Sequence, residues 1–263
     1  MTTLRLYVEG IGLWSPHLGD FAALRSLLAG GTNAAAAAPV AALLPANERR
    51  RAPESVRLAV EVAGQALAMS GRDPTLLACV FGSAHGDQPI TDAICSTLAR
   101  TPTELSPTRF HHSVHNAPAG YWTIATGCRA PSSAVCAGIH TFGAALLEAA
   151  TQVLAEQRPV LLACSDIAGR GPLQEMTGCD RAFGCALLLA PAAGINTLAQ
   201  LRLSVADDRV APTPVPATLA GEATGNPATA ALPLLTLLAE HGGICHVGCA
   251  AAMDLLIDVE PIP

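Results

Sequence analysis

Apolar residues recur along the chain in two spacings that alternate from segment to segment. Between Val56 and Leu67 they fall mostly three and four residues apart, which is the period of a helix with one buried face. The stretch 158–167, RPVLLACSDI, is instead a short apolar run of the kind that forms a buried strand. Strands that alternate with helices predict an α/β protein in which helices pack on sheets.

The same patterns place the expected elements along the whole chain. Asp20 is expected to cap its helix, and Asn116 or Ser113 to cap the helix at 113–127. The stretches 30–52 and 101–113, and the Pro-rich stretch from 210, are predicted to be irregular connections. Strands are predicted at 4–16, 75–87, 132–138, 158–167, 181–192, 197–208 and 251–261, and helices at 20–30, 53–71, 92–100, 113–127, 139–156 and 232–243.

Composition indicates a large apolar surface that has to be buried. Hydrophobic residues make up 51% of the chain, charged residues make up 14%, and the mean hydropathy is +0.39. No uninterrupted apolar stretch reaches the roughly 18–20 residues that cross a bilayer, so no membrane span is predicted. The first residues include Glu9 and lack the layout of a signal peptide, so we expect a cytoplasmic protein. The apolar surface then belongs in a core or against a permanent partner, since obligate interfaces resemble a core cut in half.

Charge argues against nucleic acid as a partner. The net charge is −6, all 15 basic residues are arginine, and aromatic residues make up only 3% of the chain. The basic surplus that nucleic-acid binding requires is therefore missing. The one basic run, at 49–51, is predicted to lie in a solvated loop, and the alternative is contact with an acidic partner.

Cysteine and histidine usage predicts no metal and no cofactor. The nine cysteines form no CxxC pair and lie mostly among small apolar residues, which suits a reducing compartment. Cys245, His246 and Cys249 lack the rest of a zinc ligand set, and the histidines within 110–116 lack a companion carboxylate or thiol. The stretch GSAHGD, 82–87, lacks the lysine of a phosphate loop and is predicted to be a tight turn.

The stretch SSAVCAGIH, 132–140, has the pattern of a strand that turns sharply into a helix. Unpaired N–H groups and the positive end of the helix dipole meet at such an elbow, and they lower the pKa of a thiol placed there. Ile139, at the elbow, has no group that can attack a substrate. Cys136 is expected to be a small buried thiol inside the strand, and nucleophilic chemistry at Cys136 is the alternative. His140 is predicted to be a surface or capping residue, and the alternatives are a base or a residue of an acyl pocket.

Four motifs follow one another in an order found in a known family. They are LYVEGIGLWSPHLGD, FGSAHGD, NAPAGYWTIATGCRAPS and VLLACSDI. In this order they resemble the N-terminal half of the β-ketoacyl synthases, over residues 4–195. The resemblance implies the thiolase-like layered fold, with helices packed on mixed sheets. It also implies an N-terminal half at 1–195 and a truncated second half at 196–263 that completes the fold. The stretch FHHSVHNAPAGYWTIATG resembles more closely still the ketosynthase-like proteins of aryl polyene pigment clusters, some of which are chain length factors.

The register of this resemblance places Ile139 where the family has its nucleophilic cysteine, because the interval from Pro131 to Val160 is the same. The family has two catalytic histidines in its second half. The first has no counterpart here, and His246 in ICHVGCAAA resembles the second. The resemblance therefore implies a subunit without condensing activity, since no acyl-enzyme forms without a thiolate.

The function implied by the resemblance is that of a chain-length-factor-like subunit, which forms a heterodimer with an active β-ketoacyl synthase in a type II polyketide, aryl polyene-like pathway. The partner would supply the cysteine and the histidines, and most of the contact with the acyl carrier protein. Apolar bulk in a shared tunnel limits chain growth, and the candidates for lining that tunnel are Ile139, His140 and Phe142. The alternatives are a divergent condensing or acyl-transfer enzyme that uses Cys136, and a purely structural partner. The interface is expected on strand 132–138 and helix 113–127, and its candidate residues are Ser113, Asn116, Tyr121, Trp122, Ser133 and Val135.

Overall fold

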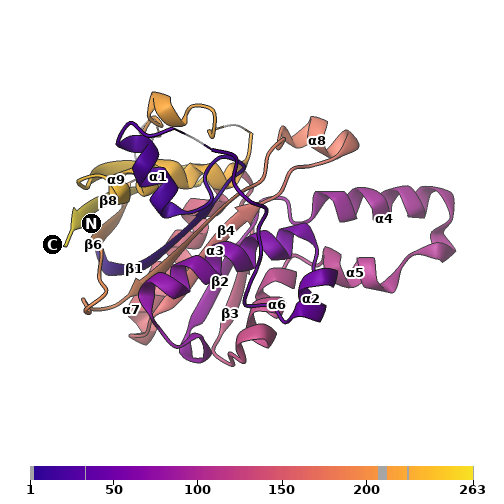
Figure 1. Ribbon diagram of the computed structural model, residues 1–263, viewed down its shortest axis with the longest axis horizontal. Helices are drawn as coiled ribbons and strands as arrows, with labels where there is room; N and C mark the ends of the chain where they lie inside the picture. The colour runs from indigo at the N-terminus through magenta and orange to yellow at the C-terminus, as the bar shows by residue number, and fades with distance from the viewer. Residues whose placement is uncertain (1–2, 33, 207–211, 224, 263) are drawn as a thin grey trace.

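One sheet of eight strands runs through the part of the protein that the structure describes. The computed structural model describes residues 3–32, 34–206, 212–223 and 225–262. The strands lie in the order β3-β2-β4-β5-β1-β6-β8-β7, and helices cover both faces of the sheet (Figure 1). β2 is parallel to β3 and to β4, and the other neighbouring pairs are antiparallel. The predicted α/β architecture, with helices packed on a mixed sheet, is confirmed.

The bounds of the elements follow the chain. The strands are β1 Leu4–Trp14, β2 Ala78–Gly82, β3 Ser132–Val135, β4 Val160–Asp166, β5 Phe183–Ala190, β6 Ala199–Ala206, β7 Gly243–Ala250 and β8 Met253–Pro261. The α-helices are α1 Phe21–Leu28, α2 Ala46–Arg51, α3 Glu54–Ser70, α4 Gln88–Arg100, α5 Pro107–Ser113, α6 Ala117–Thr126, α7 Thr141–Glu156, α8 Gly171–Thr177 and α9 Leu232–Ala239.

Two hydrophobic clusters, one on each face of the sheet, hold the helices in place. α3 and α6 pack on one face, and α7 packs on the other face together with α1 and α9. The side chains of β4 alternate between the clusters, with Leu161 and Ala163 on the α3 face and Leu162 and Cys164 on the α7 face. Burial of one leucine side chain contributes about 1.5–3 kcal/mol, so the fully buried strand β4 is a centre of the fold.

Helices α1 and α4 each begin directly after an aspartate whose side chain caps the helix. Asp20 accepts a hydrogen bond from Ala23 N at 2.7 Å, so it caps α1 as predicted. Asn116 precedes α6 without such a bond. α4 begins at Gln88, four residues before the predicted start, because Asp87 caps it by accepting from Ile90 N at 3.0 Å.

Three local predictions are wrong. The second part of the loop predicted at 101–113 is α5, which Ser106 caps and in which Pro107 takes the first position. The arginines 49–51 lie in α2 and not in a loop. β7 follows α9 in a stretch with no predicted strand, although its residues Cys245, Val247 and Cys249 alternate toward the core.

The chain beyond residue 196 extends the same sheet instead of building a second one. β6 pairs with β1, β8 pairs with β6, and β7 closes this end of the sheet as an edge strand. The last two residues of the strand predicted at 197–208, and the first two of the irregular stretch from 210, lie outside the described residues. Within the described ranges, the helices are all too short or too polar to cross a membrane.

Candidate functional site

The elbow between β3 and α7 is built by one glycine and one threonine. Gly138 has a φ of +57, a conformation that glycine adopts without strain, and it turns the chain after β3. Thr141, fully buried, accepts a hydrogen bond from Ala137 N at 2.9 Å and donates one to Gly138 O at 2.7 Å. The turn is therefore held rigidly, and it presents Ile139 outward with 72% of its surface exposed.

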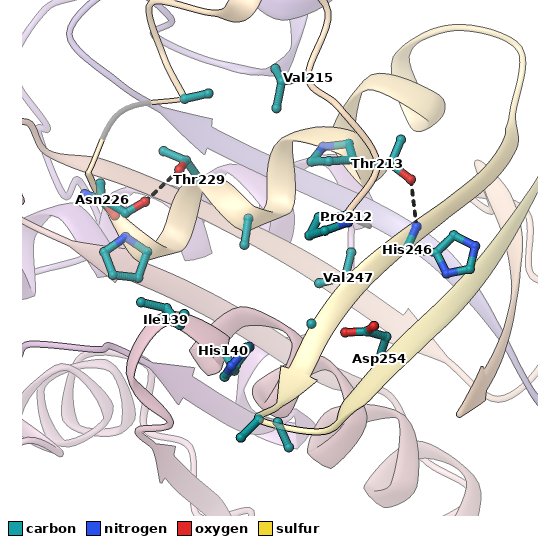
Figure 2. Close-up of a pocket in the computed structure, with 17 residues that line it drawn as sticks. Ile139, His140, Pro212, Thr213, Val215, Asn226, Thr229, His246, Val247 and Asp254 are labelled. Atoms are coloured by element: carbon teal, nitrogen blue, oxygen red, sulfur yellow. Dashed lines mark hydrogen bonds between the residues drawn. The ribbon is translucent and has the colours of Figure 1, made fainter. Parts of the chain in front are cut away.

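Ile139 and His140 form one wall of a groove of about 680 Å³. The opposite walls come from the segments 212–215 and 226–233, from Ala223 and from the β7–β8 hairpin (Figure 2). Most lining side chains are apolar, and the labelled polar ones in Figure 2 include Thr213, His246 and Asp254. A groove of this size, with a mostly apolar lining and several polar groups, is within the range of small-molecule binding sites, about 300–1,000 Å³.

Close helix–strand packing sets the position of His140. Gly143 of α7 lies directly against the carbonyl of Gly248 in β7, so a larger residue at Gly143 would force the helix off the sheet. A Cβ added at Gly248 would lie only 2.8 Å from His140 Nδ1, which places the imidazole over that glycine. The predicted surface or capping role of His140 is therefore incomplete, because its half-buried side chain also lines the groove.

His246 reaches the same groove from β7. Its main-chain N donates to Thr213 Oγ1 at 2.9 Å, which ties the segment 212–215 to the strand. Its Nδ1 is buried without a hydrogen-bond partner among the described residues. The sequence motif that contains His246 and the elbow that contains Ile139 thus meet in space. Thr213 and Asp254 also line the groove, and no sequence motif singles them out.

Cys136 lies outside the groove. β3 ends at Val135, so Cys136 is exposed in the turn that follows, and its predicted burial inside the strand is wrong. The Sγ–H group donates to Ala84 O at 3.4 Å. The thiol faces the β2–α4 turn, and it does not occupy the elbow position.

Two of the residues predicted to serve the tunnel or the interface belong to the core. Phe142 is 1% exposed and packs in the cluster on the α7 face, so it does not line the groove. Trp122 is fully buried, and its ring centroid lies 6.4 Å from that of Phe81 under α6. The helical period that places both residues on apolar faces assigns them to the core, because those faces pack on the sheet.

The remaining interface candidates lie on accessible surface. Ser133 and Val135 are half-buried on β3, which is an edge strand with β2 on one side. Ser113 and Tyr121 are half-buried, and Asn116 is exposed, on the adjoining helices. α4 and α5 extend away from the body on this side (Figure 1).

The turn GSAHGD and the end of β4 form a polar cradle. Asp166 is 2% exposed and accepts hydrogen bonds from Ser83 Oγ at 2.7 Å, His85 N at 2.9 Å and Ala84 N at 3.1 Å. Burial raises the pKa of Asp166 above its ordinary value, although these three donors lower it. The cradle fixes the turn to the sheet, so the predicted tight turn is confirmed.

Two histidines of FHHSVHN make polar contacts with neighbouring elements. His115 Nε2 donates to Ser83 O at 2.8 Å, and His112 Nε2 lies 2.9 Å from Tyr121 Oη. Burial and the neighbouring His111 lower the pKa of His112. No group of three or more metal-ligating side chains occurs within the described ranges.

Comparison with known proteins adds to this geometry. No curated protein matches. Among solved structures, a ketosynthase (ApeO) in complex with its chain length factor (ApeC) from Xenorhabdus doucetiae matches at a TM-score of 0.70 and 23% identity, over 97% of this chain and 99% of the matched chain. The complex AntDE:AntF, a type II polyketide synthase acyl-carrier protein with its ketosynthase, matches at 0.74 and 14%, over 99% and 100%.

A longer relative matches only in part. A β-ketoacyl synthase from Burkholderia phymatum STM815 has a TM-score of 0.60 and 14% identity, over 82% of this chain and 68% of its own. The family model of the β-ketoacyl synthase N-terminal domain matches residues 26–242, which is most of the chain. The protein described here, with its thiolase-like ketosynthase fold, therefore belongs to the β-ketoacyl synthase N-terminal domain family.

Proposed function

We propose that this chain is a non-catalytic, chain-length-factor-like subunit that pairs with an active β-ketoacyl synthase in a type II polyketide pathway of the aryl polyene kind. The observation that carries the proposal is the elbow. An alkyl side chain, 72% exposed, stands at the helix start where the resemblance places the nucleophile. A condensing enzyme needs a thiolate at that point to form its acyl-enzyme.

The extent of the structural matches to chains of ketosynthase complexes supports a subunit role. The matched chains in the ApeO–ApeC and AntDE:AntF complexes are covered over 99% and 100%, so they are about as long as this one. Three ketosynthases are covered over only 68%, 45% and 46% of their length. A chain of the ishigamide ketosynthase/chain length factor is covered over 59% of its length. Within the proposed subunit, residues 1–195 form the ketoacyl-synthase-like half and residues 196–263 form the short half.

The free edge of β3 is the proposed pairing site for the ketosynthase. Pro131 O and Val135 O accept hydrogen bonds from Cys79 N and Ser83 N, both at 3.1 Å, on the β2 side. Because main-chain groups alternate in direction along a strand, those of Ser132 and Ala134 point to the free edge. An unpaired edge of this kind is a template for a second chain.

The groove is the proposed continuation of the acyl tunnel. Ile139 and His140 line it from the elbow, and apolar bulk there would limit how far a chain extends. Phe142 takes no part, since it is in the core. The partner would supply the reactive cysteine and the histidines. It would also dock the acyl carrier protein, because a net charge of −6 does not favour an acidic partner.

Pairing is tested by co-production with the ketosynthase encoded beside this chain, followed by sizing of the purified complex. Ala134→Pro removes a main-chain N–H at the free edge and leaves the hydrogen bonds between β3 and β2 in place. The affinity for the ketosynthase should therefore fall by about ten-fold or more. Ala134→Val keeps the N–H and suits a strand, so it should pair as the wild type does. A wild-type chain that never associates with the ketosynthase would refute the subunit role.

The tunnel claim is tested on the reconstituted pair by product length. Ile139→Ala enlarges the groove and should shift the products to longer chains, whereas Ile195→Ala, which changes a fully exposed residue, should not. Unchanged lengths would favour a purely structural partner.

A second candidate is an acyl-transfer enzyme that uses Cys136, and the exposure of that thiol favours it. Cys136→Ala should leave the activity of the pair unchanged if the chain is non-catalytic. Loss of activity, together with stoichiometric acylation of Cys136, would support the enzyme instead.

A further inference from the structure

The proposed edge pairing is too small to hold a stable partner by itself. β3 has four residues, whereas stable interfaces bury about 1,200–2,000 Å² in total, with some 20–30 residues on each side. The partner must therefore cover surface beyond the strand. α6 lies beside β3 and β2, so the surface of α6 and its neighbours continues from the edge.

A small apolar cavity opens on this adjoining surface. Its volume is about 220 Å³, and residues from α2, α5 and α6 and their connections form its walls. This volume is below the roughly 300–1,000 Å³ of small-molecule sites, and it matches a single large side chain more closely. The walls include Leu44, Val114, Gly120, Tyr121 and Ile124.

Apolar side chains at the rim of this cavity are left in water. Ile124 is 81% exposed and Val114 is 43% exposed. An exposed apolar rim around a preformed hollow is the arrangement that receives an anchor residue in protein interfaces. Glu48, His111 and Asn116 also line the cavity, so polar groups accompany its apolar walls, as they do in protein interfaces.

We propose that this cavity receives one large apolar side chain of the ketosynthase subunit and is an anchor point of the pair. The proposal rests on the proposed function, since it names where the same partner is held. The ketosynthase is the favoured occupant because the cavity adjoins the β3 edge and most of its lining residues are apolar. An acyl carrier protein drawn to the arginines of α2 is the competing occupant, and the experiment separates the two.

Gly120→Leu is the decisive variant. A Cβ at Gly120 meets no atom within 4 Å, and Gly120 lines the cavity, so the backbone has room for a leucine, whose side chain adds bulk to the hollow. Glycine is a poor helix residue, so the variant alone should melt at a higher temperature than the wild type. Its affinity for the ketosynthase should nevertheless fall by about thirty-fold, the effect of losing one strong anchor contact.

Gly221→Leu is the matched control, because Gly221 is also exposed and its added Cβ meets nothing within 4 Å. It should bind the ketosynthase as the wild type does. A Gly120→Leu chain that binds the ketosynthase normally, while wild-type pairing is intact, would overturn the anchor but not the subunit role. Loss of carrier-protein binding in place of ketosynthase binding would assign the cavity to the carrier protein and equally overturn the proposal.

Discussion

Strands β3 and β4 both pair in parallel with β2, but only β4 has a neighbour on its other side. All seven residues of β4 are buried, whereas none of the four residues of β3 is buried. Apart from Asp166 at the end of β4, both strands are built from small or apolar residues, SSAV and VLLACSD. The difference shows that place in the sheet decides which strand is enclosed within the chain and which keeps an open edge.

Each strand also leads to a different kind of site. Asp166 ends β4 in a closed cradle whose hydrogen bonds are made within the chain. β3 leads to an open elbow, where Cys136 and Ile139 are exposed. The buried end serves stability, and the open end carries the features from which the function is proposed.

Thiol reactivity should give the largest contrast between the two strands. Cys136 follows β3 and is exposed, whereas Cys164 in β4 is fully buried, and burial raises its pKa well above the ordinary value. A reagent reaches Cys164 only when the protein unfolds. We therefore expect Cys164 to be alkylated about a thousand-fold or more slowly than Cys136 at pH 8. Peptide mapping after timed alkylation measures both rates.

The same measurement on the assembled pair sharpens the comparison. If the ketosynthase covers β3, the alkylation rate of Cys136 should fall in the complex, and that of Cys164 should stay the same. Cys95 of α4 is the internal control for an exposed thiol outside β3. Equal rates for Cys136 and Cys164 in the isolated chain would contradict the burial of β4.

Truncation of a side chain should affect stability strongly on β4 and hardly on β3. Leu161 is fully buried among the residues packed under α3, so Leu161→Ala should lower the free energy of unfolding by about 2–5 kcal/mol. Ser132 is exposed on β3, so Ser132→Ala should change it by less than about 0.5 kcal/mol. Denaturant titration of both variants measures the two changes in unfolding free energy. Similar losses would show that β3 contributes to the stability of the isolated chain as much as β4 does.

The cradle at the end of β4 should give a smaller, pH-dependent effect. Burial raises the pKa of Asp166 above the ordinary 3.8, so the folded protein holds this proton to higher pH than the unfolded chain does. Its contribution to stability is present below pH 3.8 and is lost as the pH rises through the folded pKa. Asp166→Asn cannot titrate, so the unfolding free energy of the wild type relative to this variant should fall over that window. A pH-independent difference would show that burial does not control this carboxyl.

The long periodic segments were predictable, whereas α5 and β7 were not. The helix predicted at 53–71 is α3, Glu54–Ser70, because its apolar period matches one buried face. α5 escapes prediction because seven residues provide too little of a period, so its capping residues decide it. β7 escapes because its alternation uses cysteine and glycine instead of the usual strand residues.

The candidate site divides in the same way. Ile139 could be assigned to the elbow from the sequence, because the turn from β3 into α7 is formed by residues that are close to one another in the chain. Thr213, His246 and Asp254 join it only through the folding of β7 and β8 against α7. Sequence spacing cannot show that packing, because these residues are more than seventy positions away from Ile139.

By itself, the sequence determined the alternation of helices and strands, the glycine turn at Gly138 and the alkyl side chain beside it, because these depend on local backbone and side-chain chemistry. Only the tertiary structure decided that β3 lies at an edge, that Phe142 and Trp122 are buried, and that a groove and a small cavity flank the elbow and α6. The reason is physical: exposure depends on which segments pack against a residue, and those segments are remote in the chain.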